Sequence, residues 1–438
     1  MERVDDYSGP FDPDFSLARL SRKALARLGR EYLMTGHVHD RALMPILGSR
    51  FGAEAMTDVA IDEWMGSSPI YNARNRRSLG VVGDGVSSIF KGLQLDVGAP
   101  HQYMDFRYEL VDESQGFFWL DYCGALMDVS AMAGGRDEPI IQMCHHMEDP
   151  TFDATVMAVN PGARCRPVFR PPLAKGHTGP VCRWEVKITD EHGAVEERAI
   201  TKAMRKTLAA GFEFSDAGDS SSAAGGLDDY SGAFLPDFAL EDLSHRALVR
   251  QCKEFALDVH LLIWASHLSV LERWGEEVRS EIAREHWAGA APIYVERIRA
   301  ALEIKGDDME AILKMLQVDP GLPHDYVDFG CHLSSPDLGQ FWINDCAGLR
   351  EGGVRGWLSL LDDLEAPGFD AVVASVNSRA RCRPIAPDSV MAWTEGLRPD
   401  RAWEIIIDPA APPREESRWA AAGRVSTVYR FEFADKMV

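Results

Sequence analysis

The sequence lacks the short motifs of several common enzyme classes. No glycine-rich phosphate loop follows a predicted strand, so a nucleotide-binding site of that kind is not indicated. The pattern Gly-x-Ser-x-Gly is absent, which argues against the nucleophile elbow of α/β-hydrolases. No Cys-x-x-Cys pair occurs among the 8 cysteines, which argues against thioredoxin-type exchange and simple iron–sulfur ligation.

Positive charge and long apolar runs are also scarce. The 46 Lys and Arg residues stand against 68 Asp and Glu residues, and the net charge of −22 would repel nucleic-acid phosphates and acidic membranes. The longest apolar stretch, residues 259–271, is interrupted by histidines and serines and is shorter than the ~20 residues of a membrane helix. Residues 1–6 contain no hydrophobic signal-peptide core. We therefore expect a soluble, cytoplasmic protein with reduced thiols and with neither nucleic acid nor a membrane as partner.

Most of the sequence occurs twice. The pentapeptide at residues 5–9 returns at residues 228–232, and the same offset of 223 relates Trp64 to Trp287. Later in each copy the offset falls to 217, which indicates a six-residue shortening near residues 132–137. The sequence predicts two tandem copies of one domain. We expect a first repeat over residues 1–214, a linker over residues 215–227 and a second repeat over residues 228–438.

Each copy changes from helical to strand periodicity along its length. In the first copy Leu17, Leu20, Ala24 and Leu25 share one helix face, and further amphipathic stretches begin at Gly52 and near residue 85. Helices followed by strands predict an α+β fold: two tandem homologous domains, each a helical half followed by an antiparallel sheet. The expected strands of the first copy are residues 103–110, 117–123, 166–170 and 183–188.

The residues that best suit a metal ion lie in the first copy. Cys144, His145, His146 and Glu148 fall within five residues of helical pattern. On a helix either Cys144 or His145 projects from the same face as Glu148, and because adjacent histidines point in different directions, only one of them is expected to join the site. The corresponding residues 361–365 of the second copy have lost the thiol and both imidazoles.

Three further thiols of the first copy, Cys123, Cys165 and Cys182, extend this candidate set. Thiolate, imidazole and carboxylate together suit Zn²⁺ or non-haem Fe²⁺ better than Mg²⁺ or Ca²⁺. Cys123 and Cys165 recur in the second copy as Cys346 and Cys382, so burial in a core explains these two equally well. A buried helix histidine beside a carboxylate is likewise an alternative account of the pair His39 and Asp40.

The order of these groups resembles one known family. His39-Asp40 precedes Arg50-Phe51-Gly52, and Cys123, Cys144, Cys165 and Cys182 follow, the last just before Trp184. In this order the chain resembles the aminothiazoline-carboxylate hydrolase-like proteins, over most of residues 16–190 and less closely over residues 239–407. The family is similar in outline to vinyl-reductase-type sensor domains, which place a Cys and Glu zinc site beside a buried ligand pocket. Arg41 and Ala42 depart from the small and aromatic residues that usually follow the His-Asp pair, so the substrate does not carry over.

The resemblance implies either ring-opening hydrolysis of a C–N bond or small-molecule binding. On the first interpretation, zinc or non-haem iron held by Cys123 or Cys144 with His145 or His146 would lower the pKa of bound water. Glu148, or His39 oriented by Asp40, would then move the proton. We therefore expect a metal-assisted hydrolase or related lyase that acts on a small nitrogen-containing molecule, with the second copy as its degenerate partner in an intramolecular pseudo-dimer. The alternatives are a small-molecule-binding or sensor module with a structural metal, and a scaffold without metal.

Overall fold

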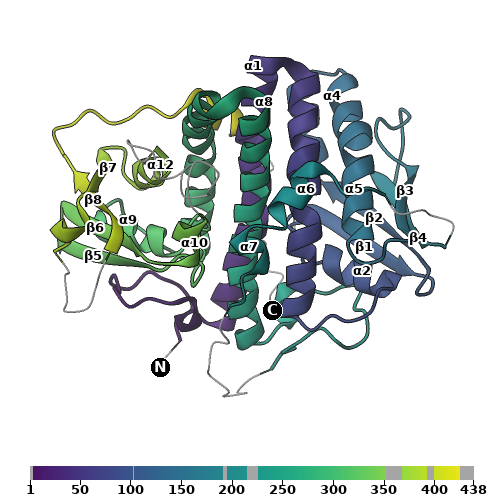
Figure 1. Ribbon diagram of the computed structural model, residues 1–438, viewed down its shortest axis with the longest axis horizontal. Coiled ribbons are helices and arrows are strands. Elements are labelled where there is room, and N and C mark those ends of the chain that lie inside the picture. The colour runs from purple at the N-terminus through teal and green to yellow at the C-terminus, as the bar shows by residue number, and fades with distance from the viewer. Residues whose placement is uncertain are drawn as a thin grey trace.

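Two long helical segments form the centre of the molecule (Figure 1). The computed structural model describes residues 3–101, 103–190, 195–214, 225–351, 367–391 and 399–424. Segments α1 (Arg22–Ser78) and α8 (His245–Ala301) are each broken at a glycine, Gly52 with φ 87° and Gly275 with φ 84°. Residues with a Cβ rarely adopt this conformation, and the chain reverses direction there. Each segment is therefore a hairpin of two antiparallel helices.

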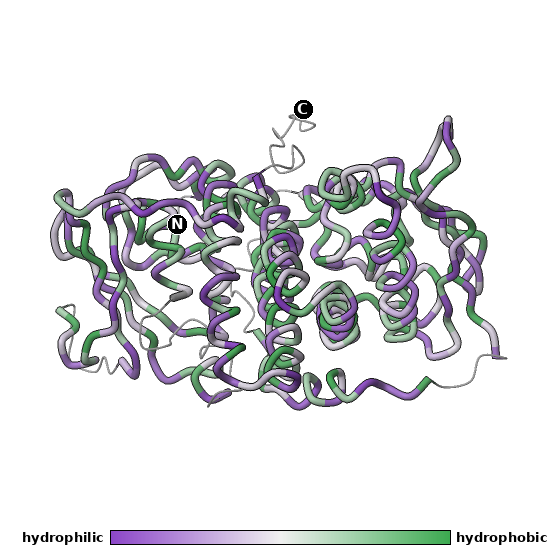
Figure 2. The backbone as a smooth tube through the Cα atoms, turned by 90° about the horizontal axis from the view of Figure 1, so that it is seen from above, coloured by the Kyte–Doolittle hydropathy of each residue, from purple (hydrophilic) through white to green (hydrophobic). Residues whose placement is uncertain are grey.

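The two hairpins pack together as a four-helix bundle, whose contact surface is the main hydrophobic core (Figures 1 and 2). Small residues allow close approach: a Cβ on Gly66 would lie 3.1 Å from Ala265, and a Cβ on Gly289 would lie 2.9 Å from Ala42. These two contacts are the same contact made twice, because both residues of each pair are related by the repeat offset. The bundle is therefore a pseudo-symmetric interface between the two copies.

An antiparallel four-stranded sheet lies on each side of the bundle (Figure 1). Trp184 and Trp403 are fully buried at matching positions, where their rings stack on Phe118 and Phe341. The predicted α+β fold with two tandem copies is confirmed. The first sheet has the order β1 (Met104–Leu110), β2 (Gln115–Cys123), β4 (Cys182–Ile188), β3 (Ala163–Phe169), and the second has the order β5 (Phe329–Ser335), β6 (Leu338–Asn344), β8 (Pro399–Ile407), β7 (Ala380–Ile385).

Shorter helices connect the sheets to the bundle. The first copy contains α2 (Val86–Leu93), α3 (Gly124–Ala133), α4 (Glu138–Ile141), the π-helical turn η2 (Gln142–Met147), α5 (Glu148–Met157), α6 (Ala199–Met204) and α7 (Leu208–Gly211). The second contains α9 (Met309–Gln317), α10 (Ala347–Arg350), α12 (Pro367–Val376) and α13 (Arg418–Gly423), and short 3₁₀ turns are η1 (Leu17–Arg19), η3 (Leu240–Asp242) and η5 (Pro387–Ser389).

Each copy also sends an N-terminal arm across to the other. Tyr7 donates a hydrogen bond from its hydroxyl to Gln317 of α9 (2.7 Å), and Tyr230 donates in the same way to Gln94, which follows α2 (3.0 Å). The backbone N–H groups of both tyrosines bond to the residue that closes the opposite hairpin, Leu302 and Leu79. The copies are therefore joined by reciprocal arms as well as by the bundle.

Helix α8 owes its apolar composition to this central position. An 18-residue window of α8 has a mean hydropathy of 1.2, which length and composition alone would allow in a membrane helix, and 94% of the window is buried inside the molecule. Most of the predicted linker, residues 215–224, lies outside the described residues, as do residues 361–365, the counterparts of the Cys144 cluster.

Candidate functional site

The structure brings three of the first copy's thiols towards one carboxyl group. Cys123 is the last residue of β2, and its Sγ accepts a hydrogen bond from the backbone N–H of Leu126 at the start of α3 (3.3 Å). Cys182 begins β4, directly beside the end of β2. Cys144 lies buried in η2, and Glu148 begins α5 one turn later. We call Cys123, Cys144, Cys182 and Glu148 the thiol–carboxyl cluster.

Burial keeps the members of this cluster protonated. It raises the pKa of Cys182 to about 12 and the pKa of Cys123 and Cys144 further, and Glu148 raises all three because a second negative charge nearby is unfavourable. Burial also raises the pKa of Glu148 to about 8, against the opposing influence of the Arg170 guanidinium. At neutral pH the cluster is therefore a set of thiols beside a neutral carboxylic acid.

The two histidines of the predicted ligand set do not join the cluster. His145 donates from Nε2 to the carbonyl oxygen of Pro171 (2.7 Å), and the side chain of His146 is exposed. Within the described residues, no three His, Cys, Asp or Glu side chains converge closely enough to hold a metal ion. As placed in the described part of the chain, these side chains stand too far apart to coordinate one ion together.

Cys165 has a structural position of its own. It is fully buried in β3 under α5, and its backbone N–H donates to the carboxylate of Asp153 (2.9 Å). Cys382 makes the same contact with Asp370 in the second copy (2.8 Å). The alternative interpretation as a core residue therefore accounts for Cys165, whereas Cys182 differs between the copies and is replaced by Arg401.

His39 and Asp40 lie in the helix bundle and have different partners. His39 is hydrogen-bonded from Nδ1 to His286 Nε2 (2.9 Å), and His286 Nδ1 is bonded to His267 Nε2 (3.0 Å), so three buried imidazoles form a chain from α1 into α8. Asp40 lies instead against Glu63 in the other helix of its hairpin, where burial raises its pKa to about 7. The structure does not show Asp40 orienting His39, and their predicted catalytic roles stay predictions.

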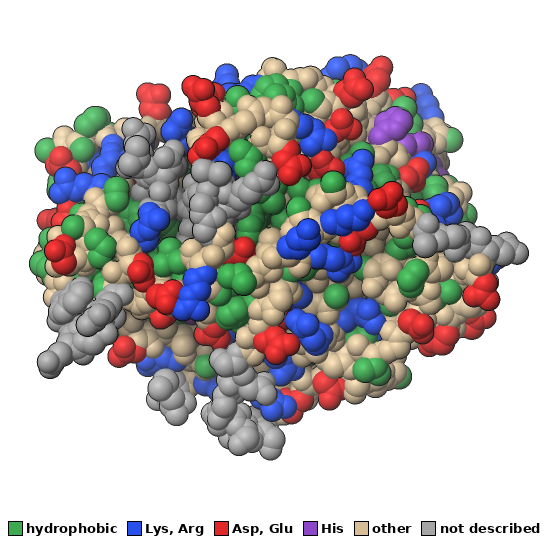
Figure 3. Space-filling model, viewed as in Figure 1, with side chains coloured by type: hydrophobic (Ala, Val, Ile, Leu, Met, Phe, Trp, Pro, Cys, Tyr) green, Lys and Arg blue, Asp and Glu red, His purple; other side chains and the backbone are tan. Residues whose placement is uncertain are grey.

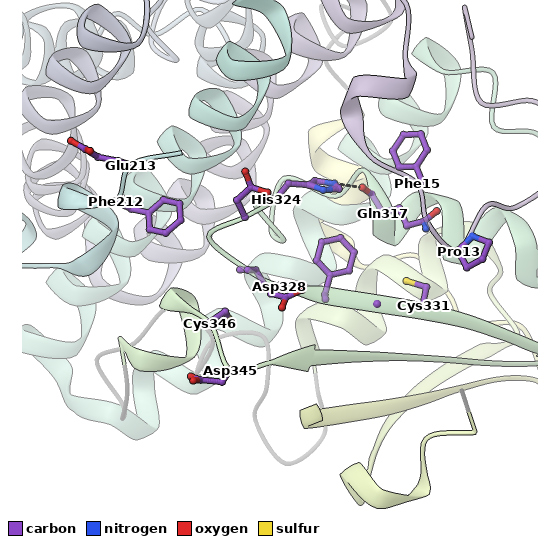
Figure 4. A pocket seen from close by; sticks show the side chains of 14 residues that line it. Pro13, Phe15, Phe212, Glu213, Gln317, His324, Asp328, Cys331, Asp345 and Cys346 are labelled. Carbon is purple, nitrogen blue, oxygen red and sulfur yellow. Dashed lines mark hydrogen bonds between the residues drawn. The ribbon is translucent and has the colours of Figure 1, made fainter. Parts of the chain in front are cut away.

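A pocket of about 510 Å³ lies on the second copy, away from the predicted residues (Figure 4). Residues of both copies line it. Pro13 and Phe15 come from the N-terminal arm, and Phe212 and Glu213 follow α7, so both of these segments belong to the first copy. The second copy forms the rest of the wall with Gln317, His324, Asp325, Val327, Asp328, Phe329, Gly330, Cys331, Asp345 and Cys346.

The candidate residues predicted from the sequence do not line this pocket, because most of them are residues that the second copy has lost. The sequence does contain a signal for it, namely positions where a large residue of the first copy is replaced by a small one in the second copy. Arg107 and Tyr108 of the first copy become the much smaller Gly330 and Cys331, which removes side-chain volume from the matching strand. Searches with the whole chain find no match among protein-family models, curated proteins or solved structures. The resemblance to the hydrolase-like family therefore stays a prediction.

Proposed function

We propose that the protein is a small-molecule-binding module whose ligand site is the pocket between the two copies. The observation that carries this proposal is the composition of the walls, since the arm around Phe15 and the segment around Phe212 cross from the first copy to close a pocket on the second. The volume of about 510 Å³ lies in the range of small-molecule sites, which often occur at domain interfaces.

Binding accounts for the lining better than catalysis. Burial raises the pKa of the Cys331 thiol to about 12, which leaves it protonated and unreactive at neutral pH. Burial lowers the pKa of His324, whose Nε2 is bonded to the carbonyl oxygen of Gln317 (2.7 Å). The Cys331 thiol is therefore not an activated nucleophile, and the neutral imidazole of His324 is a weak base.

A thermal-shift screen of a small-molecule library tests the proposal, because a ligand that binds only the folded state raises its unfolding temperature. Compounds that stabilise the protein are expected to lose that effect in the variant Phe212→Ala, which removes one wall of the pocket. Phe51→Ala is the control, since Phe51 stacks on Trp274 (3.9 Å between centroids) and does not line the pocket. The proposal is wrong if stabilising compounds act equally on Phe212→Ala.

The thiol–carboxyl cluster favours a second candidate, a metal-assisted hydrolase or lyase for a small nitrogen-containing molecule in the first copy. The specific observation is that Glu148, with a pKa of about 8, lies among three thiols, two of which the second copy lacks. Zinc, or alternatively non-haem iron, is the proposed cofactor, and it would supply a polarised water. Binding would require the side chains to move closer together than they stand.

Metal analysis of the purified protein tests this second candidate. Near one equivalent of zinc or iron in the unaltered chain, lost in Cys144→Ser and retained in Cys165→Ser, is the expected result. Metal retained in Cys144→Ser, or less than about 0.3 equivalents in the unaltered chain, would contradict it.

A further inference from the structure

We propose that the pocket selects a small organic cation, an ammonium or guanidinium group attached to an apolar body. This inference rests on the proposed function and names the ligand class of the same site. The lining of the pocket is acidic. It contains Glu213, Asp325, Asp328 and Asp345 and, among the described residues, no Lys or Arg. A pocket with this excess of negative charge attracts cations and repels anions.

Two of the four carboxylates are already neutralised. Asp325 is paired with Lys253 (2.6 Å), and Asp345 is paired with Arg350 (Nε to Oδ1, 2.9 Å). The structure describes no ion pair for Asp328 or Glu213. Figure 4 shows Asp328 between Phe212 and Cys331, while the carboxyl groups of Glu213 and Asp345 lie at the outer edge. Asp328 is therefore the carboxylate best placed to meet a bound cation.

The first copy shows what such a carboxylate holds when the chain supplies its own cation. Asp105 is the counterpart of Asp328, and it forms an ion pair with Arg107 (3.0 Å). Arg107 also reaches Asp121 (3.4 Å) and Asp237 on the arm of the opposite copy (3.8 Å). A guanidinium thus occupies the space between strand and arm in the first copy.

The second copy cannot supply that guanidinium. The counterpart of Arg107 is Gly330, and a Cβ at this position would lie 2.4 Å from the ring of Trp342. No larger side chain fits without displacing the indole, so Asp328 has no counterpart of the guanidinium that pairs with Asp105. The duplication has left one copy with an internal cation and the other with a place for an external one.

Aromatic rings give the cation's organic part its binding surface. Phe15, Phe212 and Phe329 all line the pocket. Each ring is held by a neighbour: Phe15 stacks on Tyr7 (4.4 Å between centroids), Phe212 meets Tyr326 edge-on (5.4 Å), and Phe329 meets His324 (5.3 Å). Fixed aromatic faces attract ammonium and guanidinium groups and bury apolar carbon. An inorganic cation would use the carboxylate but gain little from three phenyl rings.

The decisive experiment is calorimetric titration with three probes of one shape and different charge: 2-phenylethylammonium, 2-phenylethanol and 3-phenylpropionate. The cation is expected to bind at least about tenfold more tightly than the neutral probe, and the anion is not expected to bind. Asp328→Asn should lower the affinity for the cation by about tenfold and leave the affinity for the neutral probe unchanged. Asp105→Asn is the matched control, because Arg107 already neutralises that carboxylate, and it should change nothing.

The outcomes separate the ligand class from the function. If the three probes bind equally tightly and Phe212→Ala abolishes their binding, the pocket is a small-molecule site but does not select cations. Equal effects of Asp328→Asn and Asp105→Asn would also overturn the class, since the affinity would then reflect net charge alone. If none of the probes binds, the cation class is overturned as stated, and the library screen with Phe212→Ala decides on the pocket separately.

Discussion

Three buried imidazoles lie at the interface of the two copies and set its response to acid. Burial lowers the pKa of His286 to about 3 and holds the pKa of His39 and His267 well below the usual range, and His286 lowers the pKa of these two neighbours further because two positive charges repel. Arg279 also opposes protonation of His267. In the unfolded chain these histidines take up protons near pH 6.5. Protons therefore favour the unfolded state as the pH falls below that value.

Replacing the central imidazole should weaken this acid sensitivity. Between pH 7.5 and 5.5, His286 accounts for a loss of about 1 kcal/mol in the free energy of unfolding, which His286→Gln should remove. Burial raises the pKa of Asp40 and Asp319 to about 7, so these two carboxyl groups add stability as the pH falls. Both are present with and without the His286 substitution, so their effect cancels in the comparison. Urea unfolding at the two pH values measures the difference, and His146→Gln, at an exposed site, should leave the slope unchanged.

Glu148 gives a second test at the scale of one residue, with the opposite pH dependence. Its folded pKa of about 8 exceeds the ordinary glutamate value of 4.5, so a proton stabilises the folded state and that stabilisation is lost as the pH rises from 4.5 to 8. Glutamine mimics the neutral acid. In metal-free protein, Glu148→Gln should raise the free energy of unfolding at pH 7 by about 2 kcal/mol, with a smaller gain at pH 5.

Chemical denaturation of chelator-treated protein checks this expectation, with Glu138→Gln at the exposed start of α4 as the control. A decrease in stability together with loss of bound metal would instead mean that the carboxylate is ionised and coordinating. The same variant therefore distinguishes the thiol–carboxyl cluster as described from the metal-assisted second candidate.

The helix hairpins show how far the sequence predicts single elements. Periodicity located the helical halves and all four strands of the first sheet, because alternation and helical spacing follow directly from which face of an element is buried. It also placed the start of an amphipathic stretch at Gly52, where the chain reverses. Periodicity could not show that His39 contacts His286. It identifies which face of a helix is buried but not which distant element packs against that face.

The glycine at this reversal has a measurable role. Gly52 has φ 87° and ψ 169°, a conformation that is accessible almost only to glycine, while nothing within 4 Å would hinder a Cβ sterically. Gly52→Ala should therefore lower the free energy of unfolding through backbone strain alone, by about 1–3 kcal/mol. Gly48→Ala, four residues earlier on regular helix, should be neutral or slightly stabilising. Equal effects in urea unfolding would show that the reversal does not depend on the glycine conformation.

The candidate sites show where prediction from the sequence ends. Cys144 and Glu148 were identified because costly buried groups cluster within one helical turn, and the structure does place them near Cys123. The π-helical turn η2 changes the angular spacing on which the expected ligand face was based, and in it His145 is bonded to Pro171 while His146 is exposed. The pocket is lined by segments far apart in sequence, such as those that contain Phe15, Phe212 and Asp328, and local patterns cannot show that such segments meet.

At the scale of the whole molecule, the reciprocal arms make the two copies depend on each other. Lys314 of α9 donates to the carbonyl oxygen of Gly9, and Lys91 of α2 donates in the same way to Gly232 (2.6 Å). Each arm thus supplies hydrogen-bond acceptors to lysines of the opposite copy, and the bundle supplies the apolar contact. Figure 3 shows acidic and basic side chains mixed across the face in view, while the main hydrophobic core lies where the two copies meet.

This interdependence predicts how the chain behaves when it is divided. Residues 1–214 and 228–438, expressed separately, should each expose one face of the four-helix bundle and should aggregate or lack native helix content. Expressed together, they should co-purify as a one-to-one complex, because the bundle contact and both arms form without the linker. Size-exclusion chromatography with light scattering and far-ultraviolet circular dichroism measure both outcomes. A protease site inserted within residues 215–224 is the control, since cleavage there should leave the halves associated until denaturant is added. A monodisperse, folded fragment of either half alone would show that each copy is an independent domain and that the arms only tether it to its neighbour.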